Sequence, residues 1–178
     1  MKKEAKFEDL FQRGIESLYD AEKQIVEALP KMAAASFSEE LAGAFEAHLQ
    51  ETRQHVVRLE TIFEQMSEQP KDRTSQAMRA LLTEGEDLIA EIEKSPALDV
   101  ALAGAARKVE HWEIAAYESL GALAEVLGLQ QIVELLQESL EEEGQADDAL
   151  ADTADAILEG DTGVIIAEED AEEEPEEV

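Results

Sequence analysis

Apolar residues recur at intervals of three and four positions through most of this chain, a pattern typical of amphipathic helices rather than strands. Capping and breaking signals divide the pattern: Ser38 before two glutamates, Pro70, Ser95 before Pro96, and Gly128. Together they predict five helices, over about residues 7–34, 39–66, 75–95, 97–127 and 130–158. Pro30 is expected to kink or locally end the first of these helices near its last turn.

Four glutamates occur along these stripes with a repeated spacing. Glu22 and Glu51 are 29 residues apart, Glu113 and Glu142 are also 29 apart, and the second pair follows the first by 91 positions. At about 100° per residue, Glu22, Glu113 and Glu142 are flanked by apolar residues on both sides. Glu51 lies nearer the border of its stripe, which is interrupted by the polar residues His48, Thr52 and His55.

The 91-residue shift also superimposes apolar residues, for example Leu29 on Leu120 and Leu59 on Leu150. This relation indicates a duplicated helical hairpin. Two hairpins that each expose one apolar face bury those faces against one another. The expected fold is therefore all-α, a four-helix bundle of two pseudo-repeated hairpins in which the segment 75–95 is an additional crossover helix.

Four carboxylates directed into one bundle core would repel each other and lose their hydration, so cations between them are expected. Bundles that hold two metals typically use one Glu from each of two helices and Glu-x-x-His from each of the other two. Here Glu51 is followed by His55 at the fourth position, and no histidine follows Glu142. Glu110 or Glu138 could replace the missing imidazole, because carboxylate also suits iron and manganese.

The predicted metal ligands have alternative interpretations. A single glutamate on a helix is usually solvated, and it is the register of the four that favours ligation. His48 and His55 share one helix face and are ligand candidates. His48 is also compatible with a hydrogen-bonded core residue or with a partner that orients Glu51 or Glu113.

Composition limits the function further. The chain has 178 residues, no cysteine and a formal net charge of −30, and no Lys or Arg follows Lys108. The absence of cysteine excludes disulfides and thiolate metal sites in this chain, so any electron donor must be an external molecule. The negative field disfavours nucleic acid and membrane partners and suggests a salt-rich, halophilic cytoplasm. Residues 1–159 are expected to form the bundle, and residues 160–178 an acidic, disordered tail.

Four segments of the sequence resemble the YciE/YciF family of ferritin-like proteins: LYDAEKQIVEALPKMA, AFEAHLQETRQHVVRLE, KVEHWEIAAYESLGALAEVLG and LLQESLEEE. The resemblance covers about residues 7–158. It implies a fold similar to that of the rubrerythrins, a homodimer and a link to the stress response. Carried over by position, it implies the metal ligands Glu22, Glu51, Glu113 and Glu142, with Glu110, His48 and His55 as additions.

The leading hypothesis is thus a cytoplasmic dimetal-carboxylate protein that binds two iron or manganese ions per chain. As an enzyme it would be a peroxidase or a ferroxidase, protecting the cell from oxidants. The alternative is a non-catalytic helical homodimer that acts as a stress-related scaffold. Iron storage in a cage is the weaker third hypothesis, because a heavily acidic surface hinders close packing of subunits.

Overall fold

The computed structural model describes residues 6–70 and 73–169, with the side chains of the last helix described as far as Gly160. Within these residues the chain forms α-helices and no strands. The helices are α1 (Phe7–Ala35), α2 (Glu39–Met66), α3 (Gln76–Glu91), α4 (Pro96–Val126) and α5 (Gln130–Glu169). The sequence prediction of an all-α bundle with an additional crossover helix is confirmed.

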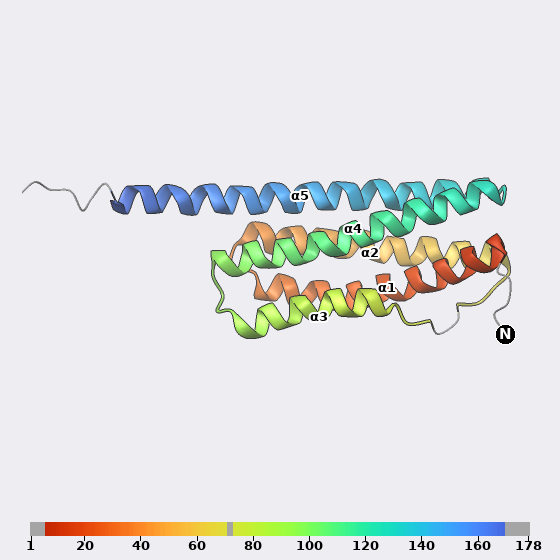
Figure 1. The fold of residues 1–178 in the computed structure, drawn as a ribbon, viewed down its shortest axis with the longest axis horizontal. Coiled ribbons are helices and arrows are strands. Elements are labelled where there is room, and N and C mark those ends of the chain that lie inside the picture. The colour runs from red at the N-terminus through yellow and green to blue at the C-terminus, as the bar shows by residue number, and fades with distance from the viewer. Residues whose placement is uncertain (1–5, 71–72, 170–178) are drawn as a thin grey trace, which may run out of the picture.

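The order of the helices in space follows from the long connection after α2. Helices α1 and α2 form one antiparallel hairpin and α4 and α5 form another (Figure 1). Helix α3 lies outside the four-helix bundle, against α1 and α4, and returns the chain to the end where α4 can begin. As a result α2 and α4 run in the same direction, as a bundle with one crossover requires.

Local signals in the sequence set most of the helix ends. The Ser38 side chain accepts a hydrogen bond from the backbone N–H of Leu41 and caps α2, and Ser95 caps α4 in the same way. Gly128 has a φ of 72° and ends α4, because a residue without a side chain adopts this left-handed conformation without strain. Pro30 neither ends nor interrupts α1, which continues to Ala35.

The end of α5 differs from the sequence prediction. The helix continues to Glu169, whereas the apolar pattern predicted an end near Leu158 and a disordered tail from Gly160. In Figure 1 the C-terminal part of α5 projects beyond the other helices. The predicted tail thus begins inside a helix, and its final residues, 170–178, lie outside the described part of the chain.

The apolar core consists of two clusters separated along the bundle axis. One cluster includes Phe11, Ile15, Leu59, Phe63, Leu120 and Leu136, and the other includes Ile25, Leu41, Phe45, Leu98, Leu102 and Leu150. Each large side chain that is fully buried stabilises the fold by about 1.5–3 kcal/mol. On each of the four bundle helices, the residues between these clusters include buried polar ones. The fold therefore encloses a polar layer between two apolar layers.

Candidate metal centre

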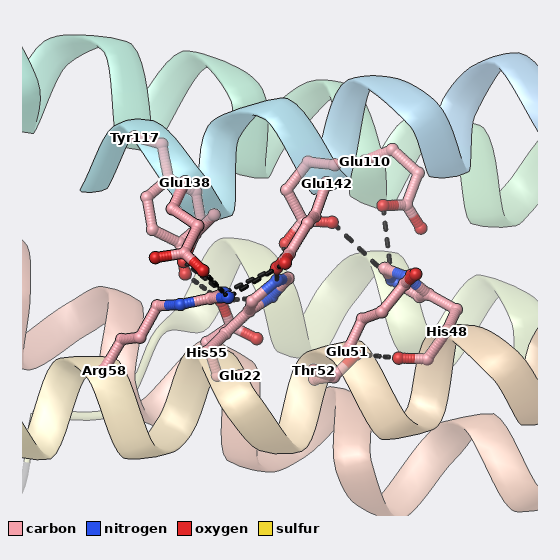
Figure 2. Close-up of polar contacts among 12 residues, drawn as sticks. Glu22, His48, Glu51, Thr52, His55, Arg58, Glu110, Tyr117, Glu138 and Glu142 are labelled. Carbon is pink, nitrogen blue, oxygen red and sulfur yellow. Dashed lines mark hydrogen bonds and ion pairs between the residues drawn. The ribbon is translucent and has the colours of Figure 1, made fainter. Parts of the chain in front are cut away.

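The polar layer is made of six buried ionisable residues that come from all four bundle helices. Glu22 lies on α1, His48 and His55 on α2, Glu110 and Glu113 on α4, and Glu143 on α5. Glu22, His55, Glu113 and Glu143 are 0% exposed, Glu110 is 2% exposed and His48 is 6% exposed. Figure 2 shows Glu22, His48, His55 and Glu110 directed into the space between the helices.

These residues form two groups whose nitrogen and oxygen atoms converge closely enough to bind a metal ion. The first group contains His48, Glu110, Glu113 and Glu143, and the second contains Glu22, His55 and Glu143. Within each group one potential ligand atom per residue lies within 4.8 Å of the others. Glu143 belongs to both groups, so its two oxygens are placed to be shared by two ions.

Many ligand atoms of the layer have no hydrogen-bond partner among the described residues. These are one carboxylate oxygen of Glu22, one of Glu110, both of Glu113, Oε2 of Glu143 and Nε2 of His48, whereas Nδ1 of His55 and Oε1 of Glu143 form an ion pair 2.9 Å apart. A buried polar atom that makes no hydrogen bond costs about 1–3 kcal/mol, and more if it is charged. In most protein cores nearly all buried polar atoms make hydrogen bonds, so the number of such atoms in one layer is unusual.

Burial and mutual repulsion govern the ionisation of the carboxyl groups in this layer. Burial raises the pKa of Glu113 well above its usual value, and the nearby carboxylates of Glu22 and Glu143 raise it further. Burial likewise raises the pKa of Glu110 well above its usual value, with a contribution from Glu143. Without a cation in the layer, both carboxyl groups therefore favour their protonated form.

His55 connects the centre to a carboxylate outside it. Its Nδ1 lies 2.9 Å from Oε1 of Glu143 and 3.4 Å from Oε1 of Glu22, while its Nε2 lies 2.7 Å from Oε2 of Glu142. Burial works against the charged imidazolium, but the surrounding carboxylates raise the pKa of His55 to about 11. One ring nitrogen thus faces the two candidate ligands and the other is bonded to Glu142.

Glu142 lies outside both ligand groups, although the sequence predicted it as a ligand. Arg58 donates to its two oxygens over 2.5 and 2.9 Å and also bonds Glu138 over 2.8 Å (Figure 2). Burial opposes ionisation of Glu142, but Arg58 and His55 lower its pKa below the usual value. Glu138, considered as a substitute ligand, is committed to Arg58 at the surface.

Glu51 also lies outside both groups. Its side chain is 48% exposed, and one of its oxygens lies 3.4 Å from Nδ1 of His48. Glu51 lies at the border of the apolar stripe of α2. Because the face with His48, Thr52 and His55 is turned toward the core, Glu51 is left at the surface. The hydroxyl of Thr52 donates to the backbone carbonyl of His48, one turn earlier.

Glu143 was missed by the sequence interpretation, which centred the last helix on Glu142. The buried positions of this helix are Ile132, Leu136, Ser139, Glu143, Asp147, Leu150 and Thr153. They recur at three and four residues, so this spacing was the signal that could have identified Glu143. The stripe instead chosen, with Leu135 and Ala149, is rotated by about 100° from it.

Tyr117 contributes a hydroxyl to the same layer. It is 1% exposed, and its hydroxyl donates a hydrogen bond to Oε1 of Glu22. Burial raises the pKa of Tyr117 well above its usual value, and the charge of Glu22 adds to the shift. The phenol therefore remains a donor and fixes one oxygen of Glu22.

Comparison with known proteins places this chain in a family. The family model described as "Domain of unknown function (DUF892)" matches residues 6–162. "Protein YciF" of Escherichia coli is 43% identical over 148 residues, which cover 83% of this chain and 89% of that protein. The chain belongs to the YciF family. This confirms the family resemblance of the four sequence segments.

Solved structures confirm the fold. The crystal structure of the E. coli stress protein YciF matches with a TM-score of 0.85 and 39% identity, covering 88% of this chain and 99% of that chain. YcfI from Rhodopseudomonas palustris, described as a candidate structural protein, matches with a TM-score of 0.80 and 36% identity, covering 83% and 94%. A Xanthomonas campestris protein with 19% identity and a TM-score of 0.69, covering 88% and 95%, shares the fold.

No described helix of this YciF-family chain is both long and apolar enough to cross a bilayer.

Proposed function

We propose that the polar layer binds two divalent transition-metal ions, iron or manganese, and that the protein uses them to react with dioxygen or peroxide. The observation that carries the proposal is Glu143, a fully buried carboxylate that belongs to both ligand groups and that lies 2.9 Å from one imidazole, His55, and 3.6 Å from the other, His48. Removing one partner of a buried charge pair typically costs about 3–5 kcal/mol. Bound cations offset such a cost across the whole layer.

The donor set suits these metals. It consists of four carboxylates and two imidazoles: Glu22, Glu110, Glu113, Glu143, His48 and His55. Oxygen and imidazole donors without thiolates favour iron and manganese, while zinc and copper are also bound by imidazole. The two groups are unequal, since one has three carboxylates and a histidine and the other two carboxylates and a histidine.

Residues outside the two groups hold the ligands in position. Glu142 bonds Nε2 of His55, which leaves Nδ1 directed at Glu22 and Glu143, and Arg58 in turn holds Glu142. A carboxylate behind a histidine ligand fixes its orientation and raises its basicity. Tyr117 orients Glu22 in a similar way.

The bound ions would supply the redox chemistry, and the protein would supply their positions and a water-poor environment. The two apolar clusters that enclose the layer restrict solvent on both sides along the bundle axis. The absence of cysteine means that any reducing equivalents come from an external electron donor. This donor, the homodimer and the salt-rich cytoplasm remain predictions.

The direct test is the metal content of the protein purified aerobically in high salt, with a Glu22→Gln/Glu113→Gln variant alongside. We expect about two iron or manganese ions per wild-type chain and almost none in the variant. Wild type that contains no metal and still refuses it after anaerobic loading would refute the proposal. Catalysis is tested next, as oxidation of ferrous iron or consumption of peroxide faster than by free metal.

A scaffold without metal is the second candidate function, and the position of His55 favours it. A charged His55 beside Glu22 and Glu143, with protons on Glu110 and Glu113, would neutralise much of the negative charge of the layer without a metal ion. Chelation distinguishes the candidates. A free metal concentration of 100 times the Kd stabilises the folded protein by about 2.7 kcal/mol. A chelator should therefore lower the Tm of a metal-binding protein and leave the Tm of a metal-free scaffold unchanged.

A further inference from the structure

A pocket between α2 and α5 leads from the surface to one residue of the centre. It has a volume of about 290 Å³, and its lining includes four alanines, Ala44, Ala47, Ala146 and Ala149, together with His48 and Glu51. Alanine side chains are short, and at this point they do not fill the space between the two helices. The two helices are therefore separated by an opening at this point.

His48 is a buried lining residue of the pocket and belongs to the centre as well. Its Nε2 lies 3.4 Å from Oε2 of Glu110 and 3.6 Å from Oε2 of Glu143, and it has no hydrogen-bond partner in the described structure. Its Nδ1, on the opposite side of the ring, lies 3.4 Å from the exposed carboxylate of Glu51. One imidazole thus contacts the surface carboxylate with one nitrogen and faces the buried carboxylates with the other (Figure 2).

Another part of the boundary between α2 and α5 carries a positive charge. There the guanidinium of Arg58 bonds Glu138 and Glu142 (Figure 2). Its positive charge repels a metal ion, and its hydrogen bonds fasten the two helices together. At the pocket, by contrast, the nearest exposed charged group is the negative Glu51.

We infer that the pocket between α2 and α5 is the entry route of the divalent cation, with Glu51 as the capture ligand at its mouth and His48 as the transfer ligand at its base. The route depends on the proposed function, because it serves the same centre. A role in capturing cations at the surface agrees with the exposure of the Glu51 side chain. No covalent step is involved: the cation exchanges water for Glu51, then for His48, and then for the buried carboxylates, whose protons pass to solvent as it binds.

The test measures the rate at which metal-free protein takes up Co²⁺, followed by visible absorption at low ionic strength, and the amount bound at equilibrium. Glu51→Gln removes the charge at the mouth, and Ala146→Leu fills the pocket. We expect each to slow uptake by about tenfold without changing the final amount bound. High salt should weaken the effect of Glu51→Gln and leave that of Ala146→Leu, because salt screens charge but not volume.

Two variants serve as matched controls. Glu46→Gln removes an exposed carboxylate of α2 that does not line the pocket, and Ala122→Leu adds the same volume to a different pocket, between α4 and α5. Both should take up Co²⁺ at the wild-type rate. Because Glu51 and Glu46 are exposed, their replacement by Gln leaves the core intact, and circular dichroism verifies the fold of all four variants.

The outcomes separate the route from the centre itself. Normal rates in both Glu51→Gln and Ala146→Leu, with a normal final amount, would overturn the route and leave the centre in place. A lower final amount in Glu51→Gln would make this residue a ligand of the centre and overturn its role at the mouth. A wild type that binds no Co²⁺, iron or manganese under any condition would overturn the proposed function and the route together.

Discussion

The two helical hairpins, α1–α2 and α4–α5, are related by a 91-residue shift in sequence, yet they supply different groups to the centre. Glu22 and Glu113 are equivalent under this shift, and both are fully buried ligand candidates. Glu51 and Glu142 are also equivalent, and both lie at the side of the centre rather than in it. At these two pairs the repeat therefore keeps both the residue type and its place relative to the centre.

The chemistry differs at two other equivalent pairs. Thr52 of the first hairpin corresponds to Glu143, and His55 corresponds to Ala146. The first hairpin thus provides the imidazoles, and the second provides the shared carboxylate. The glutamate and the histidine of a Glu-x-x-His spacing thus lie in different halves of the repeat, as Glu143 and His55. Neither hairpin contains a complete ligand group, so the centre exists only when they pack together.

The largest expected effect on metal binding is found by comparing three consecutive glutamates of α5, Glu141, Glu142 and Glu143. Only Glu143 belongs to the ligand groups. Glu143→Gln removes the shared ligand and should leave less than about a tenth of the wild-type metal. Glu142→Gln should weaken affinity by about 10–100-fold, because it releases His55. Glu141→Gln, at an exposed position, should bind normally. Equal metal content in all three, measured by mass spectrometry, would contradict the assignment of Glu143.

The next largest effect is the loss of one of the two metal ions, which tests one ligand from each hairpin. Glu22→Gln affects only the group with His55, and Glu113→Gln only the group with His48. Each variant should therefore retain about one ion per chain instead of about two. Isothermal titration of the metal-free proteins measures the number of sites. Loss of both ions in either variant would show that the two groups do not bind independently.

A smaller effect is expected at Arg58, which fastens α2 to α5 across the two hairpins. Arg58→Met keeps much of the side-chain volume and removes the bonds to Glu138 and Glu142. Glu142 should still bond His55 but with a less fixed position, so metal affinity should fall by about tenfold or less. A loss as large as that of Glu143→Gln would assign Arg58 a more direct role than the structure gives it.

The smallest effect is expected at Asp147, which fastens α5 to α4 within one hairpin. Hydrogen bonds from Arg107 and His111 lower the pKa of Asp147 below its usual value. A lowered pKa in the folded state contributes stability above the unfolded pKa, and this contribution is lost as the pH falls through the folded pKa. Asp147→Asn should therefore cost up to about 1 kcal/mol at neutral pH, given the partial exposure of the pair.

Urea unfolding at several pH values measures this difference. The gap between wild type and Asp147→Asn should close as the pH is lowered below about 4. Metal content should not change, because Asp147 lies outside both ligand groups. A gap that stays constant down to acidic pH would mean that packing, rather than charge, is responsible.

The sequence alone predicted the helices, the crossover and five of the six residues in the polar layer: Glu22, His48, His55, Glu110 and Glu113. It succeeded where polar residues interrupt a long and unambiguous apolar stripe. It did not separate Glu142 from Glu143, because the buried stripe of α5 includes several polar residues, a neighbouring stripe contains Leu135 and Ala149, and both stripes pass through a run of glutamates. There a shift of one residue turns the assumed face by about 100°.

The repeat itself reinforced that error. Glu51 and Glu142 share their spacing from Glu22 and Glu113, which indicates equivalent positions but not that these positions face the core. The spacing of the buried residues of α5 favours Glu143 at the core face, and the packing of α2 against α5 fixes that rotation. The contacts of Arg58 with Glu142 and of His55 with Glu143 join residues more than 80 positions apart, and no local pattern encodes them.

The central claim is that two metal ions share Glu143. It is tested most directly by anomalous X-ray diffraction from crystals of the manganese-loaded protein. The account predicts two anomalous peaks in the polar layer, each in bonding distance of a different Glu143 oxygen, one beside His55 and one beside His48. A fully loaded crystal with its peaks only at surface carboxylates, or with no peak beside Glu143, would contradict it.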